Sequence, residues 1–463
     1  MKLRYGFKYK TSSRTFFSTT DPNGRLSHRI IVGASLRNEE RCGQEPLRLQ
    51  LAETGILFGS LVGFVIVLFQ ALFRGTLFSS NAVGISYRSI PIGKYAVSMA
   101  LRHPGAYLNK WIYYRRLVKY LMVCVRNVDD FINIKGNVAA CYVNETNYTN
   151  GVYCEMAAKF NIPLYHNTYP FRLSRFLFSE NASSVDAFVV HPNLTNSPER
   201  KKIGRQVIER IVASTEKIEY MSTVEFESRE DVAFEADAIV YAHSFTDAQQ
   251  SYGGDIDFLS MYEWLLYTLN ELKDRKVLLK AHPAFFRQGY SAQVIEWDRK
   301  VFEDLAEHIS GNPNLMIIDW PMRNIDILRQ VKKSCVLISH HGNALVEGAS
   351  LGFRCISSAS APWKNYCLFN AWRTRKEYAG ILRNFNELEA TDLNDLYDYV
   401  FDLYEGAASF FHLDSWRHVV ARETGIPAIN ISRSQDSLKS LSQDEINRLI
   451  SVVSENICNV KLH

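Results

Sequence analysis

The sequence predicts an α/β protein with two Rossmann-like domains that face a cleft. Its 463 residues exceed what one ordinary hydrophobic core fills, which favours two domains. Hydrophobic residues make up 47% and charged residues 22%, proportions typical of a globular protein. In the second half, short apolar strands alternate with helical segments and no hairpin signal intervenes. This alternation is the pattern of a parallel sheet covered by helices.

We expect five segments along the chain, divided by changes in composition and periodicity. They are a polar, poorly ordered leader at 1–54, a hydrophobic membrane-associated or buried helix at 55–80, an N-terminal Rossmann-like domain at 81–232, a C-terminal Rossmann-like domain at 233–390, and C-terminal helices at 391–463.

An uncharged run from Gly55 to Phe73 is the strongest membrane signal in the sequence. At about 1.5 Å per residue, a helix of this length crosses a bilayer core of about 30 Å. Two interpretations stay open, because glycine, serine and glutamine dilute the hydrophobicity of the run. It is either a helix that spans or lies in a membrane, or a helix buried in the first domain.

In residues 85–230, an apolar strand, a polar loop and a helix follow one another. We expect a long helix at 106–133, a strand at 138–143, a helix at 152–160 and a strand at 164–165. Glu145 lies in the polar loop, at the carboxyl end of the first strand. It is either a general base acting on a sugar hydroxyl or an acid in the first turn of the following helix.

The second domain begins near Phe234 and has the clearest pattern. We expect strands at 237–242, 277–280, 315–318, 336–338 and 354–357, and helices at 258–272, 296–309 and 325–331. Beyond it, an amphipathic helix near 391–403 and a last helix after the capping box at 442–445 complete the chain.

A polar cluster follows the strand at 336–338 and opens a helix. It consists of Ser339, His340, His341, Gly342 and Asn343. A phosphate placed there gains backbone N–H groups, the helix dipole, and hydroxyl and imidazole donors, and Gly342 lets the backbone approach closely. The alternative is a polar corner that Asn343 caps.

Two further positions belong to the predicted site. Glu347, one turn into that helix, is placed to accept hydrogen bonds from a ribose, although alone it is an ordinary helix acid. His282 and Pro283 form a second corner after the strand at 277–280, where proline fixes the turn and the imidazole projects as a donor.

The charged residues restrict the chemistry. A net charge of only +4 gives no electrostatic basis for nucleic acid as a partner. No carboxylate cluster and no Cys/His cluster at zinc spacing is present, so we expect neither a metal ion nor a cofactor. Asp247, in the loop that follows the strand at 237–242 and includes His243, is the second candidate for a catalytic base.

The motifs together resemble the bacterial capsule polysaccharide biosynthesis glycosyltransferases, a group that includes the Kdo transferases. They are YRSIPIG at 87–93, VNETNYTNG at 143–151, HSFTD at 243–247, YEW at 262–264, KAHP at 280–283 and SHHG at 339–342 with Glu347. The His-Pro and Ser-rich corners are also similar to those of CMP-sugar-using sialyltransferases. The resemblance covers about residues 85–400.

This resemblance implies a GT-B fold whose C-terminal domain binds the donor, with His282 and Ser339 near the donor phosphate. The chain has Ser339-His340 where the family usually has Ser-Ser, which leaves the nucleotide open. We therefore expect a metal-independent glycosyltransferase that moves a sugar from a nucleotide sugar, such as a CMP-sugar, to a glycan or glycolipid acceptor of a surface or capsular polysaccharide.

Other functions use the same fold and stay open. They are a nucleotide-sugar epimerase, a CDP-alditol phosphotransferase, and a non-catalytic polysaccharide assembly or binding factor. We expect association with a membrane surface at the cytoplasmic face. The alternative is a single-pass membrane protein with a lumenal catalytic region, in which the N-x-S/T triplets would be glycosylated.

Overall fold

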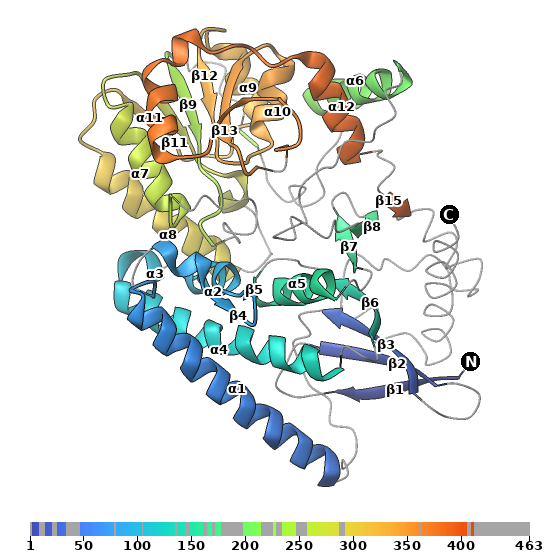
Figure 1. The fold of residues 1–463 in the computed structure, drawn as a ribbon. Helices are drawn as coiled ribbons and strands as arrows, with labels where there is room; N and C mark the ends of the chain where they lie inside the picture. Colours follow the sequence, from blue (N-terminus) through green and yellow to red (C-terminus); the bar gives the residue numbers. More distant parts are fainter. Residues whose placement is uncertain are drawn as a thin grey trace.

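The computed structural model describes residues 2–8, 14–20, 26–33, 47–77, 80–103, 105–134, 138–143, 148–160, 164–168, 172–176, 198–213, 226–227, 234–246, 257–286, 292–361, 363–404 and 409–411. The molecule is a mixed α/β protein (Figure 1). One sheet with its helices lies at the top of the view, and a second sheet lies at the lower right beside a layer of helices. The expected last helix after residue 442 falls outside the described residues.

The upper sheet is parallel throughout, as the alternation of strands and helices predicts. Its spatial order is β11-β10-β9-β12-β13-β14. The chain therefore starts at central β9, moves outward through β10 and β11, then returns beside β9 and moves outward the other way. The strands are β9 (Ala238–Tyr241), β10 (Val277–Lys280), β11 (Leu315–Ile318), β12 (Val336–Ile338), β13 (Arg354–Ser358) and β14 (Asn370–Trp372).

Helices cover both faces of this sheet because side chains alternate along each strand. Ala238 and Val240 belong to one buried core, whereas Ile239 and Tyr241 belong to the other. The first core also contains residues of α7 (Met261–Glu271), α8 (Ala292–Ile309) and α11 (Arg375–Arg383). The second contains residues of α9 (Asn324–Gln330) and α10 (Ala344–Ser350).

Two helices from outside the expected second domain also pack on the second core. They are α6 (Pro198–Val212), from the segment expected to be N-terminal, and α12 (Leu393–Tyr404). Val207 and Ile208 of α6 share this core with Leu396 and Val400 of α12. The backbones approach so closely that a Cβ at Gly204 would overlap the Tyr397 carbonyl. Helix α6 therefore shares a core with the parallel sheet, although it precedes residue 232 in the sequence.

The lower sheet is mixed and not parallel. Its order is β1-β2-β3-β6-β7-β8-β15, with parallel pairing only at β3–β6 and β6–β7. Three of its strands lie in the segment that we expected to be a poorly ordered leader. That segment is polar overall, but it contains short runs rich in Phe, Thr, Ile and Val, which favour strands. The strands are β1 (Lys2–Lys8), β2 (Arg14–Thr20), β3 (Leu26–Gly33), β6 (Val138–Val143), β7 (Leu164–Thr168), β8 (Arg172–Phe176) and β15 (Ser409–Phe411).

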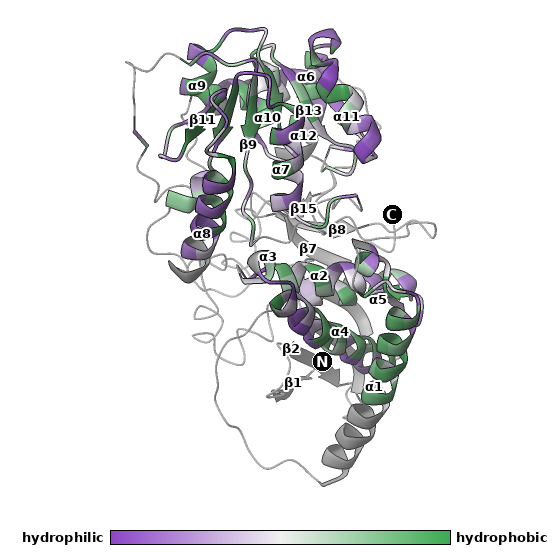
Figure 2. Ribbon diagram, turned by 90° about the vertical axis from the view of Figure 1, so that its left-hand side faces the viewer, coloured by the Kyte–Doolittle hydropathy of each residue, from purple (hydrophilic) through white to green (hydrophobic). Residues whose placement is uncertain are grey.

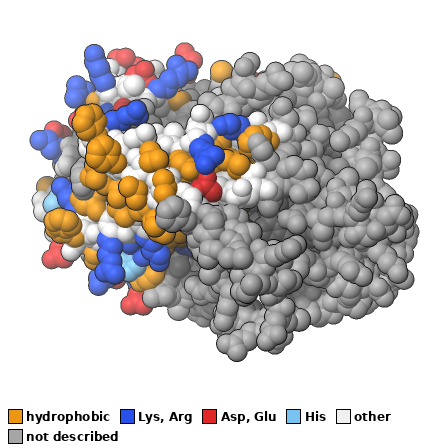
Figure 3. Space-filling view, turned by 60° about the horizontal axis from the view of Figure 1, so that its bottom comes forward, with side chains coloured by type: hydrophobic (Ala, Val, Ile, Leu, Met, Phe, Trp, Pro, Cys, Tyr) orange, Lys and Arg blue, Asp and Glu red, His pale blue; other side chains and the backbone are white. Residues whose placement is uncertain are grey.

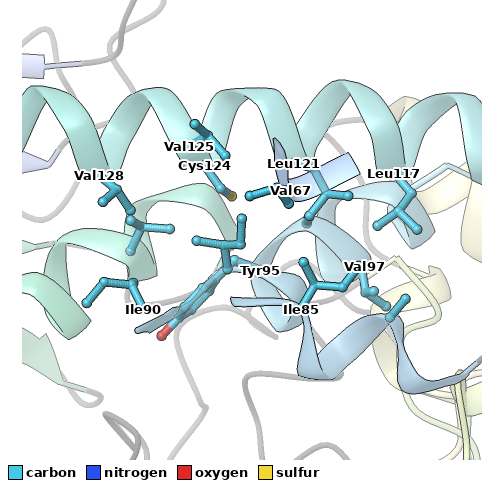
Figure 4. Packing of buried hydrophobic residues seen from close by; sticks show 14 of the residues in the cluster. Val67, Ile85, Ile90, Tyr95, Val97, Leu117, Leu121, Cys124, Val125 and Val128 are labelled. Carbon is cyan, nitrogen blue, oxygen red and sulfur yellow. The ribbon is translucent and has the colours of Figure 1, made fainter. Parts of the chain in front are cut away.

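A layer of helices forms the third buried core, part of which is shown in Figure 4. Leu117, Leu121 and Val128 recur at helical spacing along α4 and face Val67, Ile90 and Tyr95 from the elements around them. The elements are α1 (Leu47–Phe73), α2 (Gly93–Leu101), α3 (Gly105–Leu108), α4 (Lys110–Ile134), α5 (Gly151–Lys159) and the hairpin of β4 (Ser86–Tyr87) and β5 (Ile90–Pro91).

Helix α1 is only half buried, an arrangement that neither interpretation of the run at 55–73 describes fully. Phe64, Val67 and Ala71 pack into the core, whereas apolar side chains on the opposite side are exposed. Figure 2 shows the green, hydrophobic C-terminal half of α1 along the edge of the molecule. Among the residues searched, which are those that the structure describes, no helix combines the length and hydropathy needed to cross a bilayer.

Candidate functional site

Three polar turns meet at one edge of the parallel sheet. His243 follows β9, His282 follows β10, and Ser339 to His341 follow β12. These strands are parallel neighbours, so their carboxyl ends lie together. The ring centroids of His243 and His282 are 4.9 Å apart, and those of His243 and His341 are 4.2 Å apart. The structure thus brings together the two corners that the sequence analysis singled out, with His243 between them.

The position of these turns in the sheet is informative. The chain moves outward from β9 in one direction and from β12 in the other, so the sheet reverses its winding between these two strands. Loops at such a reversal diverge to opposite faces and leave a crevice outside the strand ends, where open α/β sheets bind ligands. His243 and the turn from Ser339 to His341 flank this reversal.

The His340 and His341 side chains are buried and bonded to each other. Their Nδ1 atoms are 3.0 Å apart, which requires one N–H to donate and the other nitrogen to accept. Two stacked indoles, Trp264 and Trp372, each present a ring edge-to-face with His340 at 5.8 Å between centroids. The pair is therefore held in one orientation by packing on its apolar side.

Burial keeps both imidazoles neutral. It lowers the pKa of His340 to about 3, with a further contribution from His243. Burial, with smaller contributions from His243, His340 and His282, holds the pKa of His341 well below its ordinary value. At neutral pH these side chains are hydrogen-bonding groups without charge, so any anion at this turn is held by N–H dipoles.

Ser339 and Gly342 form a tight turn at the start of α10. The Ser339 Oγ accepts a hydrogen bond of 3.0 Å from the Gly342 N–H, and a Cβ at position 342 would overlap that oxygen. Asn343 is exposed, and its side chain makes no capping hydrogen bond to α10 within the described residues. Because α10 has only seven residues, its dipole adds little to the binding of an anion. An anion at this turn would be held mainly by the hydroxyl, imidazole and backbone N–H groups.

His282 and Pro283 form the second corner. Pro283 begins a 3-10 turn, Pro283–Phe286, and the His282 Nδ1 accepts a hydrogen bond of 3.2 Å from the Ala284 N–H. A nitrogen that accepts in a neutral imidazole carries no proton, so the proton of His282 lies on Nε2. The turn therefore leaves Nε2 as the nitrogen through which His282 donates.

Glu347 lies in a polar network on the α9 and α10 face of the sheet. The Asn324 Nδ2 donates to its carboxylate over 2.8 Å, and the Tyr241 hydroxyl donates to Asn324 over 2.6 Å. Burial raises the pKa of Glu347, which Asn324 and Lys280 partly offset. Lys280, at the end of β10, is buried, and burial lowers its pKa to about 8. Sequence reasoning missed Lys280 and Asn324 as partners of Glu347.

The loop after β9 is held from two sides. Asp298 of α8 is buried and accepts hydrogen bonds from the Ser244 hydroxyl, at 2.5 Å, and from the Thr246 N–H, at 2.8 Å. The Tyr107 hydroxyl of α3 donates to the Phe245 carbonyl. Residues of the helical layer and of the parallel sheet thus meet at the loop that carries His243.

Both candidate bases, Glu145 and Asp247, lie outside the described residues. Each still follows a strand whose position is known, since Glu145 comes two residues after β6 and Asp247 comes one residue after the loop held by Asp298. Within the part of the chain that the structure describes, no group of three or more His, Cys, Asp or Glu residues is arranged to hold a metal ion.

No protein-family model matches the sequence, and no curated protein matches it. Solved structures that match this chain include Thermosulfurimonas dismutans KpsC, a beta Kdo 2,4 transferase, with a TM-score of 0.37 and 11% identity over 57% of this chain and 79% of that one. The Anabaena protein Alr3699/HepE, in complex with UDP and glucose, matches with a TM-score of 0.28 and 7% identity over 65% of this chain and 68% of that one. Methanocaldococcus jannaschii UDP-GlcNAc 2-epimerase matches with a TM-score of 0.26 and 11% identity over 68% of this chain and 97% of that one.

A Kdo transferase is therefore among the structures that this chain resembles, and Kdo transferases also belong to the group that its motifs resemble. At such low TM-scores and identities, these likenesses carry no argument about the reaction.

Proposed function

We propose that this protein is a glycosyltransferase that binds a nucleotide sugar at the carboxyl ends of β9, β10 and β12. The observation that carries the proposal is the meeting of three polar turns at the point where the parallel sheet reverses its winding. The turns offer hydroxyl, imidazole and backbone N–H groups, which are donors suited to a diphosphate or a monophosphate. A CMP-sugar is one donor of this class.

In the proposed reaction, a hydroxyl of the acceptor attacks the anomeric carbon of the donor sugar. The bond from that carbon to the phosphate oxygen breaks, and the nucleotide leaves with the electron pair. The Nε2–H of His282 and the hydroxyl of Ser339 stabilise the charge on the leaving phosphate. Because the site already supplies these donors, the proposal requires neither a metal ion nor a cofactor.

The acceptor proton goes to a carboxylate, for which Glu145 and Asp247 are the candidates. Asp247 extends the loop that Asp298 and Tyr107 hold in place, and Glu145 follows a strand of the lower sheet. The acceptor is a glycan or glycolipid of a surface polysaccharide. In this scheme the lower part of the molecule presents the acceptor, and most of the rate comes from positioning.

Nucleotide binding by the full chain tests the proposal. Unfolding is measured with CMP, UDP, GDP and CDP in the presence of EDTA. A ligand that binds only the native state stabilises it by about 2.7 kcal/mol at about 100 times its Kd. We expect one nucleotide to stabilise the protein selectively. His282→Ala and Ser339→Ala should remove most of that stabilisation, whereas His308→Ala, at an exposed site on α8, should keep it.

Absence of stabilisation by all four nucleotides would overturn the proposal and favour a polysaccharide-binding or assembly factor. If a nucleotide binds, analysis of products separates the remaining reactions. An extended glycan supports transfer. A free rearranged nucleotide sugar would instead indicate an epimerase, and transfer of an alditol phosphate would indicate a phosphotransferase.

A further inference from the structure

The C-terminal half of α1 has an exposed apolar face. Successive exposed positions fall within one stripe at helical spacing, while the opposite stripe packs into the core. We call this stripe the outer face of α1. It consists of Leu61, Val62, Val65, Ile66, Phe69, Leu72 and Phe73. Phe69 is 69% exposed and Phe73 is 85% exposed.

Large apolar side chains seldom gather in this way on the surface of a soluble monomer, where single exposed residues are the rule. Most of the other large hydrophobic side chains that are exposed among the described residues belong to α4, which packs beside α1. They include Trp111, which is 81% exposed, Ile112 and Met122. Figure 3 views the molecule from this side, and hydrophobic side chains cover much of the described part of the face. The surface needs a partner with apolar character.

The charges around this surface are mainly positive. Residues 54–128 contain no Asp or Glu but nine Lys and Arg, although the whole chain carries a net charge of only +4. Four of the nine are exposed at the ends of α1 and along α4, namely Arg74, Lys110, Arg115 and Lys119. No ion pair within the described residues involves any of these four. The basic residues therefore remain available to an acidic partner.

We propose that the outer face of α1, with the basic residues of α4 beside it, docks the protein on an anionic membrane surface. An apolar stripe bordered by Lys and Arg matches the boundary between acyl chains and acidic headgroups. Trp111 lies where an aromatic side chain is favoured, at the level of the headgroups. The occupant is a lipid surface, and the helix lies in its plane.

The packing of α1 explains why it lies on the membrane without crossing it. Val67 contacts the core built on Leu121 and Cys124 of α4 (Figure 4). A Cβ at Gly63 would overlap the Tyr87 hydroxyl, which in turn donates to Asp129 over 3.1 Å. Freeing the helix to span a bilayer would expose this core to water, at a cost of about 25 cal/mol per Å² of apolar surface.

Vesicle flotation with the full chain tests this inference independently of any nucleotide. The probes are phosphatidylcholine vesicles and phosphatidylcholine vesicles that contain phosphatidylglycerol. We expect the protein to float with the anionic vesicles and to be released by high salt or alkaline carbonate. The double variant Phe69→Ser, Phe73→Ser should bind at least about tenfold more weakly. Its matched control, Met316→Ser with Leu393→Ser, changes exposed apolar residues elsewhere and should bind normally.

The charge contribution has its own pair of variants. Arg115→Glu with Lys119→Glu should weaken binding to the anionic vesicles at least about tenfold. Arg299→Glu with Lys300→Glu, at exposed positions of α8, is the matched control and should have little effect. Equal binding by both pairs would overturn the electrostatic part of the proposal.

Three other outcomes would overturn the proposal as a whole. The first is failure of the protein to bind either kind of vesicle. The second is a dimer in sedimentation velocity that the Phe69 and Phe73 variant abolishes, since this would make a second copy of the chain the occupant. The third is resistance of the membrane-bound protein to carbonate extraction, since this would indicate a spanning helix.

Discussion

Acid should destabilise this protein through the two buried histidines of the strand-end turn. Both side chains are buried: Trp264 and Trp372 pack against His340, and His243 and His340 pack against His341. The perturbation we consider is a change from pH 7 to pH 5, in the wild type and in the variant His340→Gln. Glutamine keeps a hydrogen-bonding side chain for His341 but does not titrate.

The size of the effect follows from the difference in pKa between the two states. The pKa of His340 is about 3 in the folded protein, against an ordinary value of 6.5. The unfolded chain therefore binds a proton as pH falls through 6.5, while the folded protein stays unprotonated until pH approaches 3. The contribution of His340 to the free energy of unfolding is therefore fully present above pH 6.5 and is lost progressively as the pH falls below it. Between pH 7 and pH 5 this loss is about 2 kcal/mol.

Urea unfolding, followed by tryptophan fluorescence at the two pH values, measures this loss. Trp264 and Trp372 contact His340, so part of the signal reports on the relevant core. Substitution alone lowers stability at both pH values, so the quantity compared is the difference between pH 7 and pH 5. We expect that difference to be about 2 kcal/mol smaller in His340→Gln than in the wild type. His308→Gln, at an exposed position of α8, should leave it nearly unchanged.

A result would refute this reasoning if His340→Gln lost as much stability between pH 7 and pH 5 as the wild type does. The folded protein would then accept the proton at His340, and the imidazole would not be held neutral by burial. The argument that N–H dipoles and not cations face a phosphate at this turn would fail with it.

Three further predictions concern the same half of the molecule. Gly348→Ala should lower the free energy of unfolding by about 1–3 kcal/mol, because the added Cβ overlaps the Leu337 side chain. Gly380→Ala, in open space on α11, should instead raise it by about 0.5–1 kcal/mol, and chemical denaturation measures both. The wild type should gain about 3 kcal/mol relative to Lys280→Met between pH 8 and pH 10.5, because burial lowers the pKa of Lys280 to about 8 while the unfolded chain still binds the proton. An equal pH dependence in Lys280→Met and the wild type, measured by urea unfolding, would contradict the assignment.

The parallel sheet was legible in the sequence for a physical reason. Strands buried on both faces need unbroken apolar runs, so the predicted strands at 277–280 and 336–338 coincide with the buried strands β10 and β12. The polar turns could also be predicted from the sequence. His282 and the residues Ser339 to His341 follow apolar runs directly, and core packing does not explain polar side chains at these positions. These features depend on neighbours along the chain.

Features that depend on distant partners were not predictable in this way. β3 of the expected leader finds its partner in β6, about a hundred residues later. Helix α6 packs directly on α12, although all the strands of the parallel sheet lie between the two helices in the sequence. Likewise, Lys280 and Asn324 join Glu347 only because their strand and helices meet on one face of the sheet. A local pattern contains no information about such contacts.

By itself, then, the sequence determined five strands of the parallel sheet and the polar residues that follow three of them, but it did not reveal β14. Only the tertiary structure decided that β9 and β12 lie side by side, which puts His243 against His341, and that α1 buries one apolar stripe and exposes the other. The physical reason is that hydrophobicity and turn chemistry act between near neighbours in the chain. The order of strands and the choice of the face to bury are settled by packing among residues far apart in it.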